Sequence, residues 1–225
     1  MGVAWIFILF LAAAGAIAYL GWYFKQKRIK ELASASAQLG LQFSARDPFV
    51  TLSEPFQLFT RGDGRGVENV MSGVWHGTEV RQFDYWYYEE SSNGKGGRSR
   101  TYYRFNCVIA PIEASCSRLT IDHENLFTRL ADALSFHDIE FEDEGFNKKY
   151  NVKSPDKKFA NDFVDARMMQ WLLRHGDGYA FEVNGSELLC AHKRLRPTEL
   201  IPLLGTVQEF REQVPRVVFE LYPKG

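Results

Sequence analysis

Val3–Phe24, which reads VAWIFILFLAAAGAIAYLGWYF, is a run of 22 residues without a charged side chain, and KQKRIK follows it at once. As an α-helix this run is about 33 Å long, enough to cross a hydrocarbon core of about 30 Å. Trp5 lies near one end and Trp22 and Tyr23 near the other, as expected for rings that favour the two membrane interfaces. We therefore predict that residues 1–24 form a transmembrane anchor embedded in the lipid bilayer through residues 3–24.

The charges that flank the anchor predict its orientation. Lys25, Lys27, Arg28 and Lys30 follow the apolar run, whereas no cation precedes it. The positive-inside bias then places the N-terminus outside and residues 25–225 in the cytoplasm, as in a single-pass protein of a bacterial inner membrane. A cleaved signal peptide with a site at Ala16–Ala18 is the alternative, but it calls for a charged start and a shorter apolar core. An extracytoplasmic domain remains a further alternative.

Composition narrows the class of protein. The 225 residues carry 27 Lys and Arg against 28 Asp and Glu, and 45% of them are apolar, which excludes a disordered chain and a collagen. A net charge of −1 gives no electrostatic case for nucleic-acid binding. The three cysteines, Cys107, Cys116 and Cys190, are odd in number and far apart, so no disulfide framework is predicted.

The stretch after the anchor is expected to be a helical linker over residues 25–40, which lifts the domain off the membrane and stops at Gly40. Residues 41–225 then form one cytoplasmic domain. Residues 41–43 are predicted to be a short strand. Residues 44–66 are predicted to be a loop, because they hold two prolines and the glycine-rich turn of residues 61–66.

Alternating residues in the centre of the chain predict strands over 67–75, 78–89, 99–110 and 118–121, with Pro111 closing the third. Residues 90–98, rich in Gly and Ser, are predicted to be a hairpin loop. The favoured register pairs aromatic with aromatic residues and opposite charges with each other. It places Phe83 opposite Phe105, Tyr85 opposite Tyr103, Asp84 opposite Arg104 and Trp86 opposite Tyr102.

The last hundred residues mix helices and strands. Helices are predicted from Asp122 to about residue 134, from a Ser154 cap to Gly176, and over 198–213 up to Pro215. Short strands are predicted over 138–141 and 150–153, and Asn184-Gly185 predicts a tight hairpin between 179–183 and 187–192. Strands that neighbour each other in sequence, without a βαβ rhythm, favour an α+β domain with one antiparallel sheet and about three packed helices.

Several segments of this region resemble a bacterial family of uncharacterised membrane-associated proteins that carry a domain of unknown function. The likeness lies in residues 146–154, in Asp156, in Phe159-Ala160, Met168-Met169 and Leu172-Leu173, and in the hairpin through Asn184-Gly185, and the double strand of residues 73–112 is also similar. It spans about residues 67–195. The family has no established activity, so the resemblance implies a membrane-anchored fold and supplies no catalytic residues.

No catalytic constellation is visible in the sequence. The five histidines are scattered without metal-ligand spacing, and there is no nucleophile elbow, so neither a metal nor a cofactor is predicted. Cys107 is expected to be buried, and Cys116 is expected in a loop. The glycine-rich residues 61–66 lack the ending of a phosphate-binding loop, which favours a plain turn. Glu140 and Glu142 are interpreted as a solvated strand edge, with an acid–base role as the alternative.

The aromatic strand of residues 83–88 is the most unusual stretch, because aromatic residues alternate on both of its faces. One face is expected to be core. The other face, with its partner strand, defines a candidate surface for a protein partner or lipid headgroups, unless the N-terminal segment or a helix covers it. Its residues are Asp84, Trp86, Tyr88, Arg100, Tyr102 and Arg104. The sequence thus predicts a non-enzymatic, membrane-tethered binding or scaffold module; a membrane-tethered enzyme is the alternative.

Overall fold

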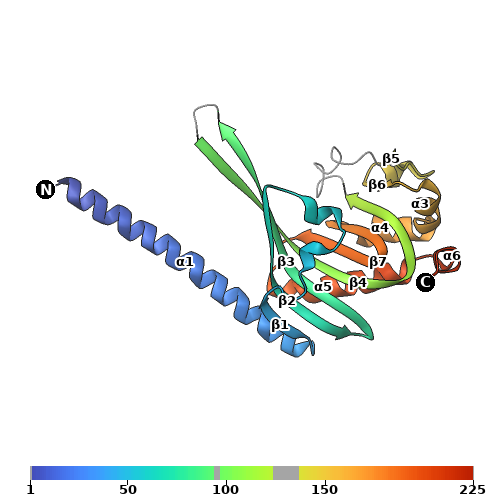
Figure 1. Cartoon of the computed structure of the whole chain (residues 1–225), viewed down its shortest axis with the longest axis horizontal. Helices are drawn as coiled ribbons and strands as arrows, with labels where there is room; N and C mark the ends of the chain where they lie inside the picture. The colour runs from blue at the N-terminus through green and yellow to red at the C-terminus, as the bar shows by residue number, and fades with distance from the viewer. Residues whose placement is uncertain (1, 94–96, 124–136, 225) are drawn as a thin grey trace.

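The computed structural model describes residues 2–93, 97–123 and 137–224. It consists of one long N-terminal helix that projects from an antiparallel-sheet domain with several shorter helices (Figure 1). The predicted α+β fold is confirmed.

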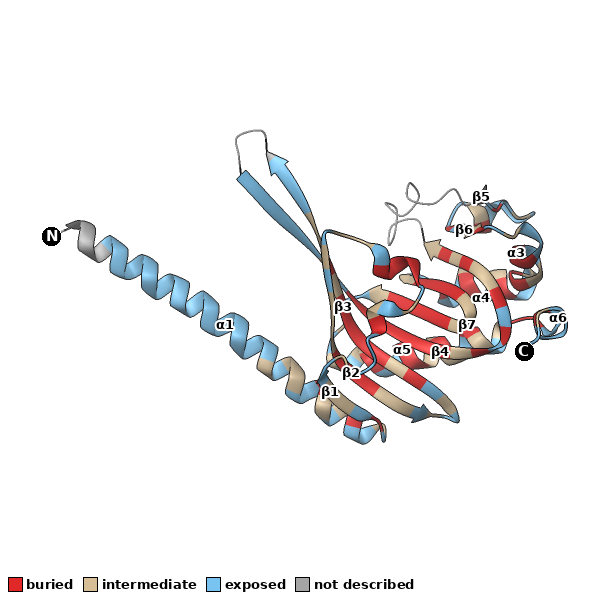
Figure 2. Ribbon diagram, in the orientation of Figure 1, coloured by how far each residue is buried: buried red, intermediate tan, exposed pale blue. Residues whose placement is uncertain are grey.

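Helix α1, Gly2–Gln38, has two different halves. Its apolar first half, from Ile6 onward, is exposed along its whole length (Figure 2). Ile6–Gln38 is the one helix among the described residues that is long and apolar enough to cross a membrane. The second half packs on the domain, because Leu32 and Ser36 are fully buried there and the Ser36 hydroxyl donates to the Leu41 carbonyl. Residues 25–38 are therefore helical, as predicted, and they pack on the domain through Leu32 and Ser36.

The sheet has seven strands in the order β1-β2-β3-β4-β6-β5, and β7 pairs with β4. Every pairing is antiparallel. The strands are β1 (Gln42–Arg46), β2 (Gly64–Trp75), β3 (Thr78–Asn93), β4 (Gly97–His123), β5 (His137–Asp138), β6 (Tyr150–Ser154) and β7 (Tyr179–Lys193). Because β2 begins at Gly64, the end of the predicted loop over residues 44–66 is part of the sheet.

Two strands are much longer than predicted. Pro111 does not close β4, which continues to His123 after a register shift and pairs with β7 on both sides of that shift. Asn184-Gly185 does not form a hairpin either. Gly185, with φ +58°, lies opposite Cys116 at the irregular point, and β7 continues through it. A glycine with positive φ suits a bulge as well as a tight turn, so the local sequence does not distinguish the two.

The helices of the domain also differ from the prediction in places. They are η1 (Thr51–Ser53), η2 (Gln57–Thr60), α2 (Glu144–Asn147), α3 (Lys157–Phe163), α4 (Ala166–His175), η3 (Pro197–Glu199), α5 (Leu200–Gln213) and α6 (Arg216–Leu221). The expected single helix from Ser154 is two helices, because Asp156 caps α3 and Asp165 caps a new start at α4. Residues 216–221, for which no helix was predicted, form α6. Most of the helix predicted after Asp122 lies outside the described residues.

Hydrophobic cores lie on both faces of the sheet. The larger one joins the second half of α1 to α3–α6 and includes Leu32, Phe163, Trp171 and Phe210. The smaller one, with Phe83, Tyr85 and Tyr87 of β3, is covered by the η1–η2 segment. Alternate residues of β3 therefore face opposite layers, and Asp84 and its neighbours on the same face point to the side where α1 lies.

Candidate functional site

The β3–β4 hairpin sets the geometry of the candidate surface. Tyr85 pairs with Phe105, Asp84 with Asn106 and Trp86 with Arg104, so the predicted register is wrong by two residues. Pairing continues out to Asn93, opposite Gly97, within the stretch predicted to be loop. A shift of two residues leaves every side chain on its predicted face, because strand side chains alternate with a period of two.

Asp84 is the centre of a buried ion-pair network and not part of an exposed surface. Arg28 of α1 donates to both of its carboxylate oxygens, from Nε at 2.7 Å and from Nη2 at 2.7 Å. A third nitrogen of Arg28, Nη1, donates to the Leu195 carbonyl at 2.9 Å. Both charged side chains are almost fully buried. This bidentate pair fixes the orientation of α1 on the sheet, because a planar guanidinium matches a carboxylate in one geometry.

Two asparagines complete the coordination of Asp84. Asn69 donates to it at 2.9 Å and Asn106 at 2.6 Å. Asn69 lies in a bulge of β2 with φ +57°, a conformation that asparagine tolerates better than most residues. Asn106 also accepts from the Leu195 amide at 2.6 Å. The carboxylate thus holds together α1, β2, β3, β4 and the segment after β7.

The aromatic and cationic residues beyond Asp84 lie together. Trp86 is 6.0 Å from Tyr102 between ring centroids, and Tyr88 is 5.4 Å from Tyr102. The Arg100 guanidinium lies 4.6 Å from the Tyr88 ring centroid and that of Arg104 lies 5.2 Å from the Tyr102 centroid. Helix α1 covers only the base of this face, and Tyr102 keeps 45% of its surface exposed.

Glycines of β2 make room for these rings. A Cβ atom at Gly64 would lie 2.4 Å from the Tyr88 ring, and one at Gly66 would lie 2.7 Å from the Trp86 ring. Each ring therefore lies against glycine backbone of the neighbouring strand. The arginines of this segment point elsewhere, since Arg65 donates to the Phe59 carbonyl at 2.6 Å. The glycine-rich segment thus has a packing role here.

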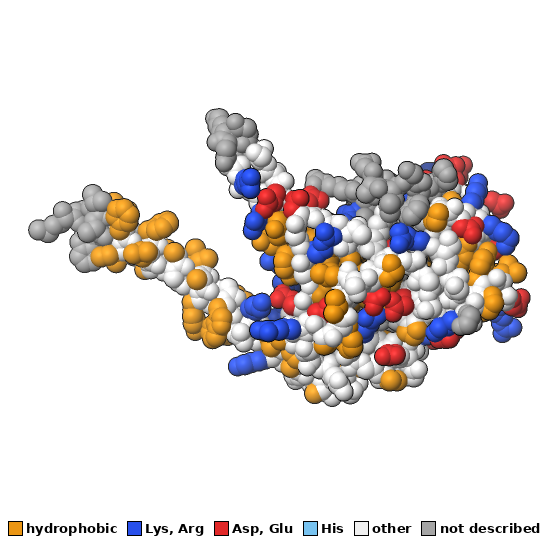
Figure 3. Space-filling view, in the orientation of Figure 1, with side chains coloured by type: hydrophobic (Ala, Val, Ile, Leu, Met, Phe, Trp, Pro, Cys, Tyr) orange, Lys and Arg blue, Asp and Glu red, His pale blue; other side chains and the backbone are white. Residues whose placement is uncertain are grey.

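A cleft of about 620 Å³ separates α1 from the aromatic face. We call it the interfacial cleft, because it begins beside Gly21 and Phe24, where the apolar half of α1 ends. Lys and Arg side chains gather where α1 meets the domain (Figure 3). The cleft is lined by Gly21, Phe24, Lys25, Arg28, Glu68, Asn69, Trp86, Tyr102, Arg104 and Arg194.

Positive charge is in excess in the interfacial cleft. Lys25 pairs with Glu68 at 3.0 Å, and Arg28 pairs with Asp84. Arg194 reaches the same Asp84 only at 3.6 Å. Burial lowers the pKa of the Arg194 guanidinium, and the nearby charges of Arg28 and Arg104 also lower it, against the opposing effect of Asp84. Like charges converging at one place favour a bound anion.

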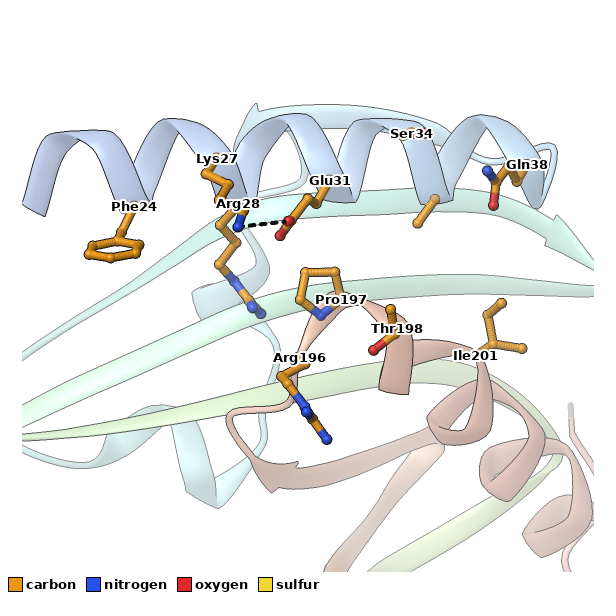
Figure 4. Close-up of a pocket in the computed structure, with 11 residues that line it drawn as sticks. Phe24, Lys27, Arg28, Glu31, Ser34, Gln38, Arg196, Pro197, Thr198 and Ile201 are labelled. Carbon is orange, nitrogen blue, oxygen red and sulfur yellow. Dashed lines mark ion pairs between the residues drawn. The ribbon is translucent and has the colours of Figure 1, made fainter. Parts of the chain in front are cut away.

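A second hollow, of about 700 Å³, lies between α1 and the chain around η3 (Figure 4). Lys27, Glu31 and Gln38 of α1 line one side, and Pro197 and Ile201 line the other. Lys27 pairs with Glu31 at 3.8 Å along the helix. Its other cations are paired as well, Arg28 with Asp84 and Arg196 with Glu199 at 2.7 Å.

Other chemically reactive groups are held in structural roles. Burial raises the pKa of the Glu182 carboxyl to about 7, although it accepts from the backbone amides of Gln57 and Leu58, and so fixes η2 against β7. Burial raises the pKa of the Cys107 and Cys190 thiols, and that of Cys116 to about 12. Cys116 is therefore a buried residue of β4 and not a loop residue. Across the described ranges, no cluster of His, Cys, Asp and Glu is suited to hold a metal ion.

Sequence reasoning missed four members of the site. In the sequence, Arg28 was used only as one of the cations that predict the orientation of the anchor. Asn69, Asn106 and Arg194 belong to no recognisable sequence motif. The usable signal was Asp84 itself, because a carboxylate in the middle of an aromatic strand has to find a cation or several donors if it is buried.

The comparison with protein-family models finds no match, and neither does the comparison with curated proteins. Among solved structures, the crystal structure of the mycobacterial trehalose monomycolate transport factor A, TtfA, is similar, with a TM-score of 0.59. The match covers 88% of this chain and 97% of that chain at 13% sequence identity. At this identity the likeness shows a shared fold.

Proposed function

We propose that this chain is a single-pass membrane protein that acts as a non-enzymatic, membrane-tethered binding module with its domain in the cytoplasm. The observation that carries this proposal is the continuity of α1. Its exposed apolar half runs without a break into a half that is fixed to the sheet through Arg28, Asp84 and Leu32. A helix anchored in this way transmits a fixed placement from the bilayer to the domain.

The named function of the structural neighbour supports a more specific role. That neighbour is called a transport factor, and its fold is the fold of this chain. We infer that this chain is likewise an accessory component that assists a membrane process by binding. In this proposal the partner surface is the part of the β3–β4 hairpin that projects beyond the domain on the same side as α1 (Figure 1).

The topology is tested with a reporter fused after Gly225 in bacterial cells. The proposal predicts activity from a reporter that works only in the cytoplasm and none from one that works only outside. Replacing Lys25, Lys27 and Lys30 by Gln should weaken this orientation, because the charge bias is lost. Arg28 is left in place since it is paired with Asp84. The control replaces Lys148, Lys149 and Lys157, three exposed lysines of the domain. Activity only outside would contradict the proposal.

The partner surface is tested by photo-crosslinking in cells. A crosslinker at Ser99 of the hairpin should capture a discrete protein, whereas one at Lys157 of α3 should not. Both positions are exposed, so the comparison is matched for access. Equal, diffuse crosslinking from both sites would remove the hairpin as the partner surface.

A further inference from the structure

We propose that the interfacial cleft binds the headgroup of an anionic membrane phospholipid. This inference rests on the proposed function, because it takes the apolar half of α1 to lie in a bilayer. The cleft then opens at the level of the lipid headgroups, beside Gly21 and Phe24.

The cleft has an excess of positive charge, which favours the binding of a phosphodiester anion. Its lining and floor combine four cations, Lys25, Arg28, Arg104 and Arg194, with two anions, Glu68 and the underlying Asp84. The paired charges cancel, and no carboxylate of the described residues lies within ion-pair distance of Arg104. An anion placed between Arg104 and Arg194 gains charge-assisted hydrogen bonds and relieves the repulsion between the two guanidinium groups.

Asn69, one of the residues that line the cleft, carries a buried acceptor. Asn69 is 3% exposed, and its side-chain oxygen has no hydrogen-bond partner within the described part of the chain. The amide nitrogen is identified by its contact with Asp84, because a carboxylate accepts and the nitrogen donates. A buried acceptor without a donor costs free energy, which a donor from a ligand restores. A headgroup hydroxyl, as in phosphatidylglycerol, is such a donor.

The aromatic residues of the cleft also support its placement at the level of the lipid headgroups. Trp86 and Tyr102 form one wall of the cleft, and Tyr102 is partly exposed. Amphipathic rings favour the headgroup region, where one side is apolar and the other wet. The rings contact the glycerol and upper acyl carbons while the arginines contact the phosphate.

Lipid binding is measured by native mass spectrometry on the full-length protein in detergent. The ligands are phosphatidylglycerol, phosphatidylcholine with matched acyl chains, and inorganic phosphate. We expect phosphatidylglycerol to bind about tenfold more tightly than phosphatidylcholine, a difference of about 1.4 kcal/mol. Inorganic phosphate, which lacks the apolar part, should not displace it at equal concentration.

Variants locate the binding site. K25Q/R104Q removes two exposed cleft cations and should abolish most of the preference. K157Q/R174Q removes the same two charges from exposed positions on α3 and α4 and should keep it. R104Q alone is a milder variant, since Arg104 is exposed and its removal leaves the Asp84 network intact. Thermal unfolding confirms that each variant is folded.

Three results would overturn the inference: equal affinity for the two lipids, an equal loss in both double variants, or full displacement by inorganic phosphate. Membrane insertion of the same proteins is read separately by resistance to alkaline extraction. Inserted protein without a lipid preference contradicts the cleft proposal alone. Protein that is extracted contradicts the membrane anchor instead.

Discussion

The two halves of helix α1 differ in what surrounds them, although the helix is continuous. Leu11 in the first half is 68% exposed, whereas Leu32 in the second half is 1% exposed. The first half is exposed from Ile6 onward and is suited to lipid. The second half packs on the domain, where Leu32 belongs to the larger core. One helix therefore has an exposed apolar segment and a segment that packs on the sheet. Arg28, at the start of the second segment, attaches the helix to Asp84 of β3.

Among the substitutions considered for the second half of α1, removal of the Asp84 carboxylate should have the largest effect on stability. Asp84→Ala leaves Arg28 buried without its partner, which typically costs about 3–5 kcal/mol. We expect the free energy of unfolding of the domain to fall by this amount in denaturant titrations, and α1 to loosen from the sheet. A cost below about 1 kcal/mol would show that the pair is not a structural link.

A matched pair of leucines sharpens the comparison of the two halves. Leu32→Ala should lower the free energy of unfolding by about 3 kcal/mol, because it opens a cavity in the larger core. Leu11→Ala makes the same chemical change in the other half and should cost less than about 0.5 kcal/mol in detergent. Equal effects would contradict the division of α1 into two environments.

Glu182 provides a reference away from α1, because it binds η2 on the opposite face of the sheet. Burial raises the pKa of its carboxyl to about 7 in the folded state, against an ordinary value of 4.5, so the folded state holds the proton more tightly. The associated stability is present below about pH 4.5 and is lost as the pH rises to about 7.

The difference between the parent protein and Glu182→Gln isolates this effect, because the amide does not titrate. We expect the parent to lose at most about 3 kcal/mol relative to the variant between pH 4.5 and 7.5. Glu220→Gln, at an exposed site on α6, is the control. A difference that does not change with pH would show that Glu182 has an ordinary pKa.

The smallest effect is expected on the outer side of the attached half. Lys27 and Glu31 form an exposed pair one turn apart, 3.8 Å between charged atoms. Lys27→Ala should change the free energy of unfolding by less than about 0.5 kcal/mol. A larger loss of the free energy of unfolding would mean that exposed side chains of α1 also contribute to its attachment to the domain.

Local sequence patterns were enough to predict α1 and most of the strands. The alternation of residues along a strand and the apolar run of the anchor are both properties of neighbouring residues. They failed where a distant partner decides. Gly185 lies in a bulge because β4 continues alongside it, and nothing near Asn184 signals this. Likewise, Arg28 and Asp84 are 56 residues apart, so their pairing was not visible in either segment. The candidate surface was predicted as a face, but not the cleft that α1 makes with it.

The placement of the cleft at the membrane surface is tested most directly by measuring the depth of the cleft in a bilayer. Because Cys107, Cys116 and Cys190 are buried, a cysteine introduced at an exposed position takes up a fluorescent label selectively. We predict that a label at Tyr102→Cys is quenched strongly by lipids that carry a quencher near the headgroup, whereas a label at Lys157→Cys is not. Equal quenching at the two positions would contradict the placement of the cleft at the membrane surface.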